Sequence, residues 1–271
     1  MTAGGTTRNG RALALKDVPS LEPSQFHGWL VNGVRDKGRR VVSYFGAAAD
    51  PASGPAAEGI GLVAVLADDA NGRLSVARTT CDGTTFGSVV PEIAQAHLFE
   101  REIAEQYGVA FEGHPWLKPV RYHHSYRPGH DAWGRSADAA IPPGVTDFFR
   151  VEGDEVHEVA VGPVHAGVIE PGHFRFQCHG EQVFHLEIAL GYQHRGVERA
   201  LVGGPTKRTL PYMETVAGDT TIGHALAYAH AVEALAGTQV SARDHAIRGI
   251  ALELERLANH AGDLGALAGD V

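Results

Sequence analysis

Cysteine is scarce in this sequence: only Cys81 and Cys178 occur among 271 residues. Two thiols cannot build a disulfide framework or a four-ligand metal site, so we expect them to be unpaired in a reducing compartment. Clustered basic residues are also missing, and the formal net charge of −9 argues against nucleic acid as the main partner. The sixteen histidines are spread along the chain without a tight metal-ligand pattern.

Long apolar runs are absent as well. No stretch approaches eighteen uncharged apolar residues, so we expect no segment that spans a membrane, and the N-terminus lacks the apolar core of a secretory signal. A hydrophobic content of 44% and a charged content of 20% are typical of globular proteins. The length suggests one large domain or two ordinary ones, and the patterns below favour the α+β class.

Alternating apolar residues predict a sheet in the first part of the chain, after a mobile leader at 1–20. The strand-like runs, separated by a Pro/Gly/Ala loop at 49–59, are 39–46, 59–68 and 72–80. A helix is expected from Pro91 to about Tyr107. Its apolar positions are Ile93, Ala96, Leu98, Ile103 and Tyr107. Residues 124–147, punctuated by Pro and Gly, are interpreted as a linker along the surface.

The second part, 148–271, opens with strand-like segments. The run 157–163 is followed by 172–180 and 181–191, which Gly180-Glu181 joins in the manner of a hairpin. Two helices are then expected. The first runs from about Thr215 to Ala236, and the second begins at Ser241 with the capping box "SARD". The stripe expected to be buried on the second helix comprises Ile247, Ile250, Leu254, Leu257 and Ala261.

The segment "LFEREIAEQYGVAFEGHPWLKPVRYH" (98–123) carries a family resemblance. It resembles the end of the C subunit of bacterial NADH-quinone oxidoreductase (respiratory complex I). The same module opens the large subunits of group 4 hydrogenases such as that of formate hydrogenlyase. The resemblance implies a small α+β domain of the C-subunit type over 21–123.

The segment "VGPVHAGVIEPGHFRFQCHGEQVFHLEIALGYQHRGVERAL" (161–201) supplies the companion. It resembles the opening of the D subunit of complex I and of nickel–iron hydrogenase large subunits, and the similarity continues at 227–235 and 248–271. The chain is therefore identified as a fused, C/D-like protein, with 148–271 as the N-terminal part of a mainly helical domain that begins with a β-hairpin. Relatives continue beyond this C-terminus, so we expect a C-terminally truncated form.

The resemblance also places the family's metal ligands. Two hydrogenase thiolates fall on Ala217 and Thr220, in the stretch "ETVAGDTTIGHA" (214–225). A methyl group and a neutral hydroxyl cannot replace thiolates at a nickel–iron pair, and Cys178 lies on the hairpin, away from this motif. We therefore expect no metal on this chain, and an iron–sulfur cluster in a partner subunit.

Quinone remains possible as a ligand. In complex I a histidine and a tyrosine grip the quinone head group, and their positions fall on Ile169 and Gly218. The first histidine of the family's loop is kept as His165, while His173 and His224 are further candidates for the cavity wall. The motif "HRGVE" supplies the candidate catalytic residues His194, Arg195 and Glu198. Its glutamate is implicated in proton transfer in the relatives; an Arg–Glu pair that pins the strand-to-helix junction is an equal alternative.

These features favour a subunit of a complex I-like or hydrogenase-like membrane oxidoreductase. Such a subunit would dock an iron–sulfur subunit, resembling the B subunit of complex I or the hydrogenase small subunit, and other arm and membrane subunits at the cytoplasmic face of the membrane. Whether the chain is itself an enzyme is left open. The resemblance links it to NADH dehydrogenase and NAD, but no G-x-G-x-x-G opens a β–α unit, so no NADH site is expected here. The alternatives are a catalytically silent assembly protein and a nickel–iron hydrogenase large subunit.

Overall fold

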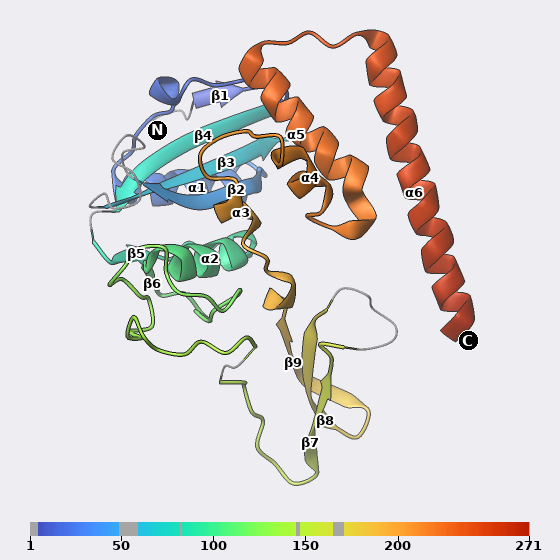
Figure 1. Ribbon diagram of the computed structural model, residues 1–271. Coiled ribbons are helices and arrows are strands. Elements are labelled where there is room, and N and C mark those ends of the chain that lie inside the picture. Colours follow the sequence, from blue (N-terminus) through green and yellow to red (C-terminus); the bar gives the residue numbers. More distant parts are fainter. Residues whose placement is uncertain (1–4, 49–58, 82, 145–146, 165–170, 271) are drawn as a thin grey trace. The chain divides into compact units, whose positions relative to one another are not determined.

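The computed structural model describes residues 5–48, 59–81, 83–144, 147–164 and 171–270 (Figure 1). The expected loop at 49–59 lies almost entirely outside them. The described residues form two compact units: the first comprises those up to Asn9, from Leu13 to Val164 and from Pro171 to Gln193, and the second comprises Gly10–Ala12 and those from His194 onward. The strands that the sequence assigns to the D-like part at 157–191 thus belong to the first unit.

A four-stranded antiparallel sheet with the order β1-β4-β3-β2 forms the base of the first unit. The three expected strands are confirmed as β2 (Arg40–Ala48), β3 (Ile60–Asp68) and β4 (Arg73–Cys81). Burial alternates along β3, as the period-2 pattern predicts. The expectation of a mobile leader is wrong in part, because β1 (Gly5–Thr7) pairs with β4 and satisfies its open edge.

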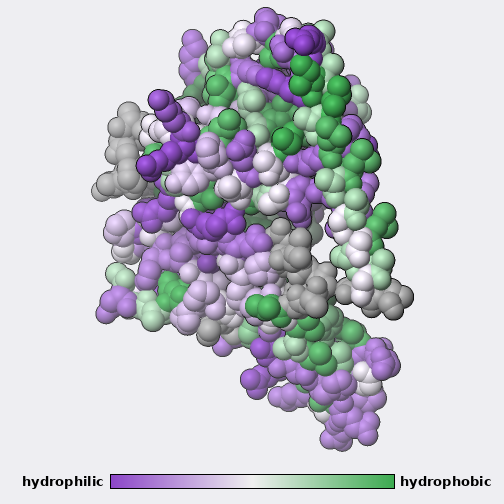
Figure 2. Space-filling model, turned by 45° about the vertical axis from the view of Figure 1, so that its right-hand side comes forward, coloured by the Kyte–Doolittle hydropathy of each residue, from purple (hydrophilic) through white to green (hydrophobic). Residues whose placement is uncertain are grey.

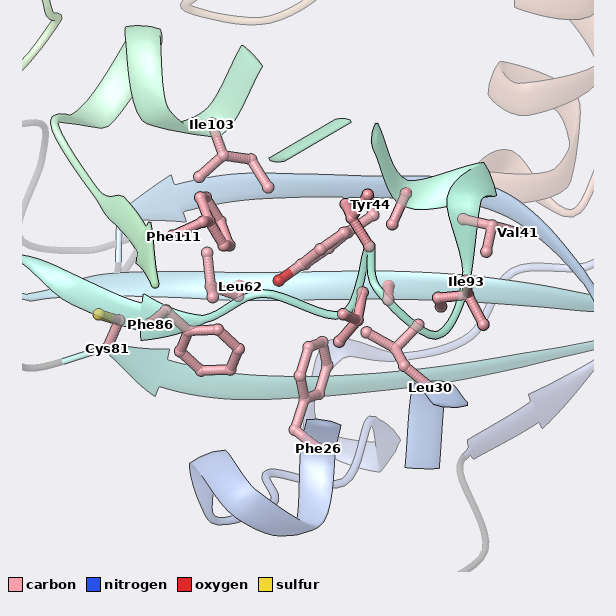
Figure 3. Close-up of a cluster of buried hydrophobic side chains, with 14 of the residues drawn as sticks. Phe26, Leu30, Val41, Tyr44, Leu62, Cys81, Phe86, Ile93, Ile103 and Phe111 are labelled. Atoms are coloured by element: carbon pink, nitrogen blue, oxygen red, sulfur yellow. The ribbon is translucent and has the colours of Figure 1, made fainter. Parts of the chain in front are cut away.

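The main hydrophobic core lies on one face of this sheet, under α1 (Pro23–Arg35) and α2 (His97–Tyr107). Figure 3 shows Tyr44, Phe26 and Phe111 packed within it. The ring centroids of Phe26 and Tyr44 are 6.0 Å apart. Helix α1 was not predicted from the sequence, although Pro23 at its first turn and the i, i+4 pair Phe26 and Leu30 are typical of a helix start and a buried face.

The predicted start of α2 at Pro91 is wrong. Ile93 is extended (φ −136°, ψ 92°) and buried, a 3₁₀ turn follows at Ala94–Ala96, and the α-helix begins at His97. The extended entry allows the Gln95 side chain to accept a hydrogen bond from the amide of Val41 (2.8 Å). A long-range contact therefore sets the boundary that local periodicity placed six residues too early. Leu98, an expected core position, is 50% exposed.

Residues 113–144, which include the described part of the linker expected at 124–147, contain no helix or strand, but they are tied to the first unit. The short parallel strands β5 (Thr85–Gly87) and β6 (Ala110–Glu112) lead into this segment. The Trp133 indole donates to the carbonyl of Leu117 (3.0 Å), and its ring packs against the core. These contacts hold the segment against the domain.

A three-stranded antiparallel sheet completes the first unit, with β7 (Val156–Val161), β8 (His173–His179) and β9 (Gln182–Ala189). The predicted β8–β9 hairpin is confirmed. His179 pairs with Gln182 across the Gly180-Glu181 loop, where Gly180 has a φ of 55° that favours glycine.

The second unit is helical. Its helices are α3 (Val197–Ala200), α4 (Thr209–Glu214), α5 (Thr221–Ala236) and α6 (Ala242–Asp270). The predicted helix over 215–236 begins at Thr221 instead, because Ala217 is extended (φ −140°, ψ 129°) and a 3₁₀ turn occupies Gly218–Thr220.

Helix α6 begins where the capping box predicts. The Ser241 hydroxyl accepts from the amide of Asp244 (3.1 Å) and donates to its carboxylate (2.6 Å). The expected buried stripe is wrong: Ile250, Leu254 and Leu257 are each 61% exposed, and Figure 2 shows apolar side chains reaching the surface along the long helix. Among the described helices, none has the length and apolar character needed to cross a membrane.

Candidate functional site

The motif that carries the C-like resemblance is a buried polar clamp. The carboxylate of Glu105, on α2, accepts hydrogen bonds from four successive amides, at Val120 (3.0 Å), Arg121 (2.7 Å), Tyr122 (2.7 Å) and His123 (3.3 Å). Glu105 is 1% exposed. Four N–H donors stabilise the ionised carboxylate and offset its loss of water. The helix thereby fixes the path of the following segment.

Arg101, one turn earlier on α2, holds the same segment. Its guanidinium donates to the carbonyls of Lys118 (2.8 Å) and Pro119 (2.9 Å) and lies 5.0 Å from the centroid of Trp116. His114, from the "FEGHP" motif, lies beside it. Burial is the main cause that lowers the pKa of His114 to about 4. The "FEGHP" tail is thus part of a rigid scaffold, with a neutral imidazole at physiological pH.

Glu100 is the most unusual carboxyl of the first unit. It is fully buried, and burial raises its pKa to about 7 although hydrogen bonds from Ser88 and Val89 oppose the shift. The Ser88 hydroxyl donates over 2.5 Å, and the Val89 amide over 2.8 Å. This group changes charge near neutral pH inside the core.

An ion pair ties the C-like tail to the hairpin. Lys118 Nζ lies 2.9 Å from the Glu187 carboxylate on β9, with side-chain exposures of 19% and 4%. The other oxygen of Glu187 accepts from the amide of Phe149 (2.9 Å). On the same polar face, Glu158 accepts from Gln177 (2.7 Å) and Arg175 (2.5 Å). The buried face of this sheet is therefore the polar one.

The opposite face of the β7–β9 sheet is apolar and open. Cross-strand register aligns Val159 with Phe176 and Leu186, and Val161 with Phe174 and Ile188. The side chains of Val159, Val161, Leu186 and Ile188 are 39–42% exposed. Apolar faces of this kind are found at protein–protein contact surfaces.

His173, a candidate ligand-binding residue, is buried in the first unit. Its Nδ1 donates to the carbonyl of Gly162 (3.1 Å), and its Nε2 accepts from Arg175 (3.4 Å). To contact a ligand, the ring would have to give up both bonds. The candidate His165 and the position Ile169 lie outside the described residues.

The "HRGVE" motif lies in the second unit and contacts a segment that is distant in sequence. The Arg195 guanidinium donates to the carbonyls of Thr215 and Val216, the latter over 3.2 Å. Through Arg195, the motif therefore contacts the segment that precedes Ala217. The side chain of Glu198, in the first turn of α3, is exposed.

The 217–224 segment is held from α6, which sequence analysis did not foresee. Glu255 accepts from the amides of Ile222 (2.5 Å) and Gly223 (3.1 Å), and Asn259 donates to the carbonyl of Asp219 (2.6 Å). The four-residue spacing of Glu255 and Asn259 was the available signal that both lie on one face.

His224, another candidate for the cavity wall, lies in the first turns of α5. Its Nδ1 donates to the carbonyl of Thr220 (2.9 Å). Because a carbonyl only accepts, this bond places the proton of the neutral ring on Nδ1 and leaves Nε2 as an acceptor. His224 is therefore set up to accept a hydrogen bond or a proton.

The donor atoms at this site do not fit a nickel–iron centre. Ala217 and Thr220 offer no thiolate, and both cysteines belong to the first unit. The Cys81 thiol donates to the carbonyls of Thr85 (3.3 Å) and Gly83 (3.5 Å). Among the described residues, no three or more His, Cys, Asp or Glu side chains gather in a way that could hold a metal ion.

Comparison with known proteins supports the resemblance. Residues 31–132 match the family model described as respiratory-chain NADH dehydrogenase, 30 kDa subunit. This match covers strands β2, β3 and β4 of the four-stranded sheet and helix α2. It also covers the clamp that Glu105 and Arg101 form with the segment after α2.

Curated relatives match a larger share of the chain than the family model does. Hydrogenase-4 component G of Escherichia coli is 31% identical over 68% of this chain and 35% of its own length. The C/D subunit of NADH-quinone oxidoreductase from Bdellovibrio bacteriovorus is 28% identical over 72% of this chain and 38% of its own length. Formate hydrogenlyase subunit 5 of Escherichia coli is 31% identical, over 66% and 33%. The chain thus spans about a third of the length of these relatives, which bear the two kinds of name that the motifs predict.

Proposed function

We propose that this chain, a fused C/D-like protein of the complex I and group 4 hydrogenase type, is a peripheral subunit of a membrane-associated oxidoreductase. It docks an iron–sulfur subunit at the cytoplasmic face and contributes the 194–224 region to the cavity where electrons leave that subunit's cluster. The cavity holds no nickel on this chain and takes a quinone-type acceptor.

The contact of Arg195 with the carbonyls of Thr215 and Val216 carries this proposal. It places the "HRGVE" motif next to a segment that has no thiolate but has a histidine, His224, whose Nε2 can accept a hydrogen bond. Such a wall suits an oxygen-containing organic acceptor better than a soft metal pair. In this role Glu198 exchanges protons with the bound acceptor, and docking of the partner removes water from its exposed side chain.

Two apolar surfaces support a role within an assembly. The open face of the β7–β9 sheet and the stripe of α6 that includes Leu254 and Leu257 are both solvent-exposed in this chain. Surfaces of this kind are buried in stable complexes, because apolar area in water is unfavourable. The iron–sulfur subunit and further arm subunits are the partners proposed for them.

The test is elemental analysis of the assembly isolated through this subunit. Iron without nickel, together with reduction of a soluble quinone by the assembly, is the expected result. Stoichiometric nickel would overturn the proposal and identify a hydrogenase large subunit. Absence of both metals would overturn it in favour of a silent assembly protein.

Substitution of Arg195 sharpens this test. Arg195→Leu removes the link to Thr215 and Val216 and is expected to reduce quinone turnover by at least about tenfold, from the loss of charge-assisted hydrogen bonds, while the iron content stays the same. Arg243→Leu, at an exposed position of α6, is the matched control and should leave turnover unchanged.

A further inference from the structure

The start of α5 lacks a cap of its own. Thr220 occupies the N-cap position but makes no side-chain capping bond. The first amides of a helix have no partner inside the helix and need an acceptor from elsewhere. Here the acceptor is Glu255 of α6, whose two carboxylate oxygens take the amides of Ile222 and Gly223. A residue distant by more than thirty positions therefore does the work of a local cap.

The same face of α6 makes three contacts with the α5 region. Arg248 pairs with Glu233 (2.5 and 3.0 Å), Glu255 caps the first turn, and Asn259 binds the carbonyl of Asp219. Spacings of seven and four residues place Arg248, Glu255 and Asn259 on one side of the helix. The Arg248–Glu233 pair lies toward the far end of α5, so docking of the helix and capping of its first turn are separate contacts.

We propose that Glu255 is a positioning residue for His224, an inference that rests on the proposed function only for calling this region a binding site. Glu255 fixes the first turn of α5, so that the carbonyl of Thr220 meets His224 Nδ1 and the imidazole presents an unprotonated Nε2. Glu255 does not touch the ligand. Its effect is to make Nε2, and not Nδ1, the nitrogen of His224 that faces the ligand.

The experiment compares Glu255→Gln with two matched variants of the full chain. Glu253→Gln removes an exposed carboxylate of the same helix, which pairs with Arg256 three residues further along. Glu233→Gln weakens α5–α6 docking without touching the first turn. Hydrogen exchange of the Ile222 and Gly223 amides and the ¹⁵N shifts of the His224 ring are measured in each.

Glu255→Gln is expected to speed exchange of both amides at least about tenfold, the effect of losing charge-assisted hydrogen bonds. It should also convert His224 from a single Nδ1–H tautomer to a mixture. Glu253→Gln should change neither readout, and Glu233→Gln should leave the tautomer unchanged. Unaltered exchange and tautomer in Glu255→Gln would overturn the proposal, as would the same tautomer change in Glu233→Gln.

Glu255→Asp serves if the Gln variant fails to fold, because it keeps the charge but withdraws the carboxylate by one methylene. The expected loss of amide protection and of the single tautomer is the same, and their retention would contradict the proposal. None of these readouts needs quinone or a partner subunit. A failure of the proposed function would therefore leave them intact, and their failure would leave the metal analysis intact.

Discussion

Each of the two units of this chain is stabilised internally by a different kind of contact. In the first unit, Phe26, Leu30, Leu62 and Leu66 are fully buried between a sheet and two helices. In the second, Thr209 is the only buried residue among those described, and hydrogen bonds from Glu255, Asn259 and Arg248 link α6 to the α5 region. The first unit has the core of an independent domain, whereas the second needs further apolar contacts to become one. A folded scaffold thus precedes a helical part that is suited to assembly.

A pair of substitutions, one in each unit, should test this difference in burial most clearly. Leu62→Ala removes a fully buried side chain and should lower the free energy of unfolding of the first unit by about 2–5 kcal/mol. Leu254→Ala, at a 61% exposed position, should change stability by no more than about 0.5 kcal/mol. All three tryptophans lie in the first unit, so fluorescence during urea unfolding follows Leu62→Ala, and circular dichroism at 222 nm, which follows the long helices, is used for Leu254→Ala. Similar effects for both variants would show that α6 is buried in the isolated chain.

Glu100 should make the stability of the first unit depend on pH. Its pKa is raised from 4.5 to about 7 in the folded state. Its contribution to the free energy of unfolding is therefore fully present below pH 4.5 and is lost as the pH rises through about 7. The loss amounts to about 3 kcal/mol. Glu100→Gln cannot ionise, and we expect the variant to gain stability relative to the wild type between pH 4.5 and 8. A constant difference across that range would contradict the assignment.

Lys118 tests whether the β7–β9 sheet is truly part of the first unit. Lys118→Met leaves the Glu187 carboxylate, 4% exposed, without its charged partner. It should destabilise the fluorescence-detected transition by about 1.5–3 kcal/mol. Lys37→Met, at an exposed position, is the control and should have little effect. If Lys118→Met acts no more strongly than the control, the sheet unfolds independently of the N-terminal domain.

Among the substitutions expected to destabilise the protein, the one at the cap of α6 should have the smallest effect. Ser241→Ala removes the acceptor of the Asp244 amide and should destabilise the second unit by about 1 kcal/mol. Circular dichroism at 222 nm follows the long helices and should register the change, while tryptophan fluorescence should not. A shift of both signals would indicate that the two units unfold as one.

Local patterns predicted the regular elements well where the partner was close in sequence. The alternation along β3, the Gly180-Glu181 hairpin and the Ser241 cap each depend on contacts within a few residues or on one buried face. The starts of α2 and α5 were misplaced because Gln95 and Glu255 set them through bonds to distant strands and helices.

The site divides in the same way. The resemblance pointed to Ala217 and Thr220 as the positions to inspect, and the "HRGVE" motif gave the candidate role of Arg195. The bonds of His173 to Gly162 and Arg175, and those of Arg195 to Thr215 and Val216, could not be inferred, because nothing in the local sequence names those partners.

By itself, the sequence determined the α+β class, the hairpin, the family resemblance and the absence of cysteine at positions 217 and 220, since each depends on residue identity or short-range period. Only the tertiary structure decided that Glu100 and Glu105 are buried, that α6 turns its polar face toward α5 and leaves its apolar stripe exposed, and that Glu255 caps a helix it does not belong to. A buried charge or a borrowed cap is stable only when distant donors converge on it, and that convergence is a property of the fold.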